Sequence, residues 1–174
     1  MSPSPATSAV AAPRARLTPE QSLAIVRARL QAYADRSVFR GFSTQPPRSG
    51  THRFKFSWLF PRPLTLQYTP TTGTFRFIGL LPAVGARSPL YGALQEFVDG
   101  CASPRRPPHR RVDRRRAKIR CVSTRGVVTV ELVATRNHHE YGVNRIVNLV
   151  NWIFQYLQRY QPEYMWKHFD SPQE

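Results

Sequence analysis

Residues 52–77 read HRFKFSWLFPRPLTLQYTPTTGTFRF, and apolar residues alternate with polar ones over three short runs. Because successive side chains of a strand point to opposite faces of its sheet, the alternation predicts three strands. They span 52–60, 64–68 and 74–77. The first strand places Phe54, Phe56, Trp58 and Phe60 on one face and Arg53, Lys55, Ser57 and Leu59 on the other. The proline-rich break at 61–63 and the turn TPTTG at 69–73 indicate an antiparallel meander.

Two more strands and three helices complete the expected fold. Apolar residues alternate with basic ones over 116–121, and a turn ending at Gly126 leads to a second alternating run over 127–133. Helical spacing of apolar residues predicts helices over 18–34, 89–99 and 138–161. The order α-β-β-β-α-β-β-α therefore predicts an α+β two-layer sandwich, with an antiparallel sheet and its helices on one face.

Each expected helix has a start signal. Thr18 and Ser88 are N-cap residues that are each followed by a proline, which is favoured at the first helical position. Asn137, with Glu140 three residues later, has the spacing of a capping box. These residues predict where the three helices begin.

With 174 residues and 41% hydrophobic content, the chain is expected to form one domain. We place the domain at 18–169, between a disordered tail at 1–17, preferred over a transit peptide, and a polar tail at 170–174. Within it, 41–51 is expected as a loop and 102–113, rich in Pro and Arg, as an extended and solvated linker. Without a long apolar run or a secretory apolar segment, we expect no membrane partner and a cytoplasmic location.

The element order over about residues 18–161 resembles that of the class I type III secretion chaperones. The resemblance is one of topology and includes no shared sequence motif. It implies a binding module, and a dimer through a helix or sheet surface is one form that such a module takes. Those chaperones tend to be acidic, whereas this chain carries 26 Lys and Arg against 10 Asp and Glu, for a formal charge of +16.

Positive charge is concentrated at 102–126, which holds ten of the basic residues and one acid, Asp113. Alternate residues of a strand project to one side about 6.5–7 Å apart, a spacing that suits successive phosphates. The expected anion-binding residues are Arg114, Arg116, Lys118 and Arg120, extended by Arg53, Lys55 and Arg76. We expect an anionic partner, either nucleic acid bound with low sequence specificity or an acidic protein. The alternative is a solvated face whose arginines pair with Glu131 and a few other acids.

Nothing in the sequence indicates catalysis or a cofactor. It contains no GxSxG, glycine-rich phosphate loop or HExxH motif, so we expect a protein that is not an enzyme. His138, His139 and Glu140 lack a further ligand at a suitable spacing, so no metal site is expected. Cys101 and Cys121 fit a disulfide or two reduced thiols, and we favour packed, reduced thiols.

The last expected helix, 138–161, has an apolar face wider than one sheet usually covers. Two interpretations stay open. The helix is either a central element packed on the sheet and the first helix, or it contributes a homodimer surface with Trp152, Tyr156 or the Met165-Trp166 segment.

Overall fold

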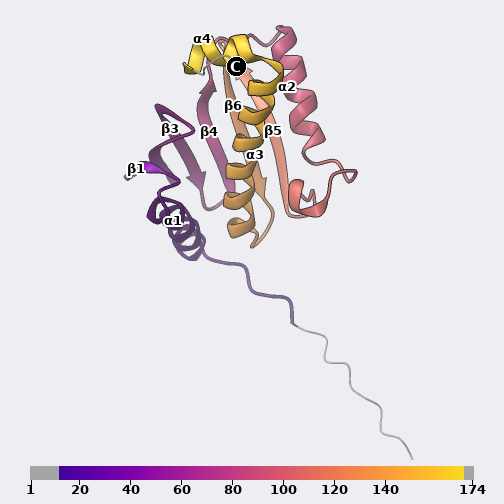
Figure 1. Ribbon diagram of the computed structural model, residues 1–174. Coiled ribbons are helices and arrows are strands. Elements are labelled where there is room, and N and C mark those ends of the chain that lie inside the picture. Colours follow the sequence, from indigo (N-terminus) through magenta and orange to yellow (C-terminus); the bar gives the residue numbers. More distant parts are fainter. Residues whose placement is uncertain (1–11, 171–174) are drawn as a thin grey trace, which may run out of the picture.

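The structure is a computed structural model that describes residues 12–170. The helices are α1 (Pro19–Asp35), α2 (Pro89–Gly100), α3 (His139–Tyr160) and α4 (Pro162–Phe169), with a short 3-10 helix η1 (Pro108–Arg110). The strands are β1 (Arg40–Arg48), β2 (Thr51–Trp58), β3 (Phe60–Thr69), β4 (Thr74–Leu81), β5 (Ala117–Thr124) and β6 (Val127–Ala134). All six strands form one antiparallel sheet of order β1-β2-β3-β4-β6-β5 (Figure 1). The predicted α+β sandwich is confirmed.

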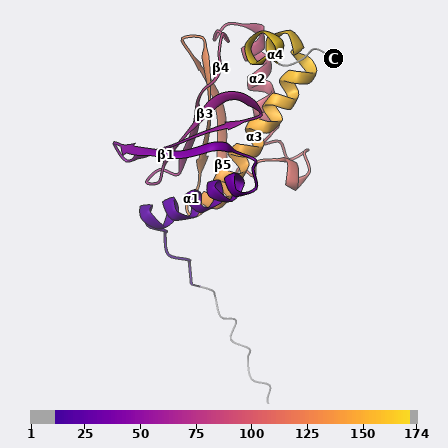
Figure 2. The same ribbon diagram turned by 60° about the vertical axis from the view of Figure 1, so that its left-hand side comes forward.

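The helices form the second layer of the sandwich. α3 crosses β4 and β6, α2 packs on β5, and α1 contacts β1 and α3 (Figures 1 and 2). Fully buried phenylalanines of β2 and β4 line the inner face of the sheet: Phe54, Phe56, Phe75 and Phe77. The aromatic face expected from the alternation is therefore the one that the helices cover. None of the helices in residues 12–170 is long and apolar enough to cross a membrane.

The segment expected as a loop at 41–51 is mostly the edge strand β1. Its ladder with β2 contains two register shifts, and Pro46 and Pro47 lie at the second. Proline lacks the N–H that a central strand would need, but an edge strand can leave that position facing solvent. The loop prediction was wrong because composition cannot show that a partner strand is available on one side.

The proline-rich break at 61–63 also lies within a strand. Leu59 takes a left-handed backbone conformation with φ 65°, and β3 starts directly after it at Phe60. Pro63 pairs with Ser57 of β2. Proline is tolerated near the first residues of a strand, so the chain reverses at Leu59 before the prolines.

Two of the three predicted helix starts are confirmed. The Thr18 hydroxyl accepts a hydrogen bond from the Gln21 amide, and the Ser88 hydroxyl accepts one from the Tyr91 amide. Asn137 does not cap α3, whose N-cap residue is His138 and makes no side-chain cap bond.

The Asn137 side chain binds the N-terminal segment instead. Its Oδ1 accepts from the Leu17 amide at 2.8 Å, and its Nδ2 donates to the Ala15 carbonyl at 2.9 Å. Of the tails expected at 1–17 and 170–174, residues 1–11 and 171–174 lie outside the described residues. The described part, 12–17, forms no helix or strand but is held to the domain by Asn137.

The linker at 102–113 is folded into turns and η1, and half of its residues are exposed. The Val112 amide donates to the Cys101 carbonyl at 2.8 Å, and the Val112 side chain is fully buried. The guanidinium of Arg111 donates to the carbonyls of Pro104 and Arg106. The expectation of an extended segment was wrong, because one buried valine and a closing hydrogen bond bring its ends together, whereas only two of its residues are buried.

Candidate functional site

The uncovered face of the sheet carries a row of polar cross-strand partners. Arg53 is paired with Gln67, Gln67 with Arg76, Arg76 with Glu131, and Glu131 with Arg120. Directly paired residues lie on the same face of a sheet, so these five side chains project to one side. At about 4.8 Å between strands, the row is roughly 20 Å long.

Lys55 and Lys118 extend this row, since each lies two residues along its strand from an arginine of the row. We call the resulting surface the open face. It consists of Arg53, Lys55, Arg76, Lys118, Arg120 and Glu131. All of its cations except the half-buried Arg53 are exposed. The pairs Arg53/Lys55 and Lys118/Arg120 each have the i, i+2 spacing of about 6.5–7 Å that the sequence predicted.

Glu131 is the acid of the open face, and two arginines neutralise it. Its carboxylate accepts from Arg76 Nε at 2.5 Å and from Arg120 Nε at 2.7 Å. Burial of the carboxyl raises the pKa of Glu131, but hydrogen bonds and charges from Arg120 and Arg76 outweigh it, so the pKa lies below its usual value. The alternative of a solvated face expected arginines to pair with Glu131, and two of them do, yet the surface keeps a clear excess of positive charge.

Arg114 and Arg116 do not join the row, contrary to the sequence-based expectation. They lie in a turn before β5, which Asp113 closes by accepting from the Arg115 amide with its side chain at 2.9 Å. The Arg116 guanidinium lies 5.2 Å from the ring centroid of Tyr141 on α3 and so points toward the helix layer. Alternation failed here because the strand begins at Ala117 and not at the first basic residue.

Tyr141 belongs to this region of the structure but was not predicted from the sequence. Its hydroxyl accepts from the Asp113 amide at 2.7 Å, and its ring has the guanidinium groups of both Arg116 and Arg145 within 5.2 Å of the centroid. The i, i+4 spacing of Tyr141 and Arg145 on a helix could have suggested one half of this arrangement. The other half depends on the tertiary structure.

Of the remaining candidates for chemistry, His139 and the two cysteines lie in the core, whereas His138 is half-buried and Glu140 is exposed. His139 is buried, and its Nδ1 is 2.8 Å from the Tyr68 hydroxyl. Cys101 and Cys121 are both buried free thiols, and burial raises the pKa of each to about 11. Within the described part of the chain, no three His, Cys, Asp or Glu side chains are grouped so that they could hold a metal ion.

α3 packs its apolar face against the sheet and the other helices. Ten of its residues are buried, which fits the interpretation of a central helix. Of the residues considered for a homodimer surface, Trp152 and Tyr156 are partly buried against the core, Met165 is buried, and Trp166 is 59% exposed. The dimer stays a prediction.

Comparison of the chain with models of known protein families, with curated proteins and with solved structures finds no match to any of them. The function must therefore be argued from the geometry of this molecule.

Proposed function

We propose that the protein is a non-enzymatic binding module that holds the phosphate backbone of nucleic acid on its open face, with low sequence specificity. The observation that carries this proposal is the charge of that face. Five cations from three strands, β2, β4 and β5, share one uncovered sheet surface with a single carboxylate from β6, and two of the cations already bind that carboxylate.

The arrangement favours phosphate over bases. Phosphate contacts supply affinity and orientation, whereas sequence is read by contacts to base edges or by stacking on aromatic side chains. None of the residues that define the open face is aromatic, and its arginines offer forked donors that match phosphate oxygens. Affinity should therefore depend strongly on salt and weakly on sequence.

The competing proposal is an acidic protein partner, as for a chaperone- or adaptor-like protein-protein interaction module. Its anionic groups would also meet Lys55 and Lys118, but a repeating backbone charge fits two separate cation pairs at strand spacing better than irregular carboxylates do. We infer nucleic acid on that ground, and the experiment below separates the two.

The test is fluorescence anisotropy with labelled single-stranded DNA, duplex DNA and RNA over a salt series. The double variant Lys55→Glu/Lys118→Glu removes two exposed cations of the open face. We expect it to weaken binding at least about tenfold near 150 mM salt and to flatten the log–log slope for duplex DNA by about two contacts.

The matched control is Arg27→Glu/Arg87→Glu, which makes the same change in net charge at exposed positions outside the open face. This control should weaken nucleic-acid binding much less than Lys55→Glu/Lys118→Glu does. Equal losses in both double variants would mean that total charge alone attracts the ligand. A wild-type protein that binds a polyglutamate peptide but none of the three nucleic acids would favour the acidic-protein proposal.

A further inference from the structure

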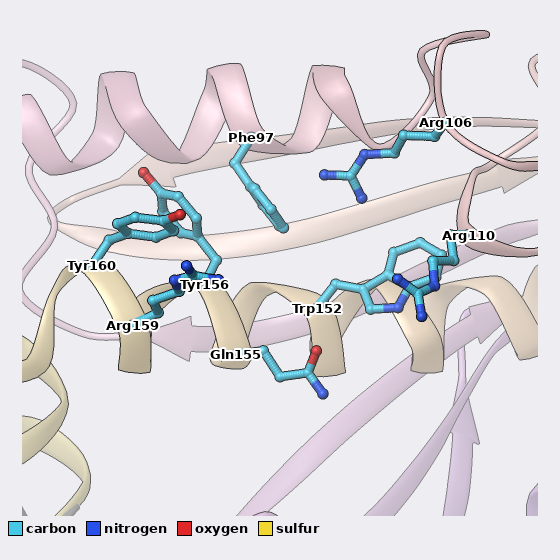
Figure 3. A pocket seen from close by; sticks show the side chains of 8 residues that line it. All are labelled: Phe97, Arg106, Arg110, Trp152, Gln155, Tyr156, Arg159 and Tyr160. Carbon is cyan, nitrogen blue, oxygen red and sulfur yellow. The ribbon is translucent and has the colours of Figure 1, made fainter. Parts of the chain in front are cut away.

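A second surface, on the helix layer, combines aromatic rings with arginines. It is a groove of about 570 Å³ between α2, α3 and the linker at 102–113 (Figure 3). Phe97 of α2 and Arg106 of the linker point into it from one side, and Trp152 of α3 faces them from the other. The sheet separates this groove from the open face, so the two surfaces are distinct.

The linker holds its arginines over the groove. Arg111 binds the Pro104 and Arg106 carbonyls, and the Arg145 guanidinium on α3 donates to the His109 carbonyl at 3.0 Å. These bonds fix the backbone before η1 and within it. Arg106 and Arg110 consequently reach the groove from an anchored segment.

The groove is positively charged. Arg106, Arg110 and Arg159 line it, and no carboxylate does. Among residues 12–170, none of these three arginines takes part in a salt bridge. Three guanidinium groups without an acidic partner around one cavity favour an anionic ligand.

The aromatic rings add a second requirement. Phe97 and Tyr156 are stacked with centroids 4.5 Å apart, and Tyr156 lies 5.1 Å from Tyr160, whose side chain is 57% exposed. The Arg106 guanidinium lies 5.3 Å from the Phe97 centroid. Flat rings next to arginines suit a ligand that has both a planar ring and a negative charge.

We propose that this groove binds a nucleotide unit, with the base stacked on Trp152 or Tyr160 and the phosphate held by Arg106 and Arg110. The shared chemistry is a phosphorylated nucleoside, whether free or part of a single strand. This proposal does not depend on the open face, because phosphate contacts alone are proposed there and none of its residues lines the groove.

The test is calorimetric titration of the full chain with AMP, UMP, a twelve-residue oligothymidylate and a polyglutamate peptide. The variant Arg106→Gln/Arg110→Gln removes the phosphate donors, and Tyr160→Ala removes an exposed ring. We expect each to weaken binding of the nucleotides about tenfold or more. Arg105→Gln/Arg115→Gln, at exposed positions outside the groove, should stay within twofold of the wild type.

Comparing the mononucleotides with the oligonucleotide distinguishes a free nucleotide from a nucleotide within a single strand. Binding of AMP or UMP without the oligonucleotide indicates a free nucleotide, and binding of the oligonucleotide alone indicates a single strand. Lys55→Glu/Lys118→Glu should leave mononucleotide binding within twofold, so a failure at one surface does not imply failure at the other. The proposal is wrong if no nucleotide binds, if Arg106→Gln/Arg110→Gln matches its control, or if polyglutamate binds equally well and Tyr160→Ala has no effect.

Discussion

Glu131 is the single acidic residue of the open face. Replacing Glu131 with glutamine should lower the free energy of unfolding at pH 7, because Arg76 and Arg120 lose a charged acceptor. The loss should be only about 1–2 kcal/mol, since both arginines are partly exposed to solvent. The folded-state pKa of Glu131 is lowered, so its stabilisation is present above the ordinary value of 4.5 and is lost as pH falls through the folded pKa. Urea unfolding at pH 7 and pH 3 measures this loss.

The same Glu131→Gln variant should bind nucleic acid more tightly, since it frees two arginines on the proposed binding surface. Glu140→Gln is the control, because Glu140 is exposed in the first turn of α3 and forms no salt bridge among the described residues. An unchanged or weaker affinity of Glu131→Gln relative to this control would contradict a role for the open face.

His139 makes stability depend on pH. Burial in the core lowers the pKa of His139 in the folded protein, and the nearby charges of Arg16 and His138 lower it further. Below about pH 6.5 the imidazole of His139 is therefore protonated in the unfolded chain while it stays neutral in the folded protein. The free energy of unfolding consequently falls from pH 7 toward pH 5, by up to about 1.4 kcal/mol per pH unit. His139→Leu should reduce this slope in urea titrations.

The control for His139 is His109→Leu, which removes an imidazole at an exposed position in η1, outside the core. Part of the slope should persist in His139→Leu, because burial also lowers the pKa of His52. If His139→Leu and His109→Leu show the same dependence on pH, the buried imidazole is not the group that titrates.

At the scale of elements, the turn of the β3–β4 hairpin is joined to the end of β6 at one glycine. Gly73 has φ +67°, its carbonyl accepts from the Ala134 amide at 2.8 Å, and an added Cβ would lie 2.6 Å from the Ala134 carbonyl oxygen. Gly73→Ala should therefore cost about 3 kcal/mol or more in urea unfolding, since both the backbone conformation and the contact are unfavourable.

Gly126 provides the matched comparison. It has φ +75° in the β5–β6 turn, but an added Cβ would meet nothing within 4 Å. Gly126→Ala should cost only the conformational strain, about 1–2 kcal/mol. If Gly73→Ala and Gly126→Ala lower the free energy of unfolding equally, the contact between residue 73 and the Ala134 carbonyl does not contribute to the loss.

At the scale of the whole molecule, the two thiols report on separation of the layers. Cys101 follows α2 and Cys121 lies in β5, and both are buried where α2 packs on the sheet. A raised pKa of about 11 and the lack of access should make both thiols react very slowly with a thiol reagent in the native protein. Labelling should become fast over the same urea range in which circular dichroism reports unfolding.

Fast labelling of one thiol well below the unfolding midpoint would show instead that α2 opens separately from the sheet. Cys101→Ala and Cys121→Ala identify which thiol reacts, because each variant leaves one thiol to be labelled. This outcome would also bear on the groove, since α2 contributes Phe97 to its wall.

Local sequence determined most of the elements of this protein. Alternation around Phe54 and Phe77 and the caps at Thr18 and Ser88 depend on neighbours a few residues away, so they could be recognised without the fold. The cation pair Arg53/Lys55 belongs to the same class, because a strand fixes the direction of its side chains.

Only the tertiary structure decided those features that depend on contacts between residues far apart in the sequence. Insertion of β6 between β4 and β5 places Glu131 between Arg76 and Arg120, and an available partner makes a strand of the proline-containing 40–48. Packing of Tyr141 against the turn at 113–116 removes Arg116 from the open face. The groove joins residues from α2, α3 and the linker, and their meeting depends on burying one shared core, which no local pattern contains.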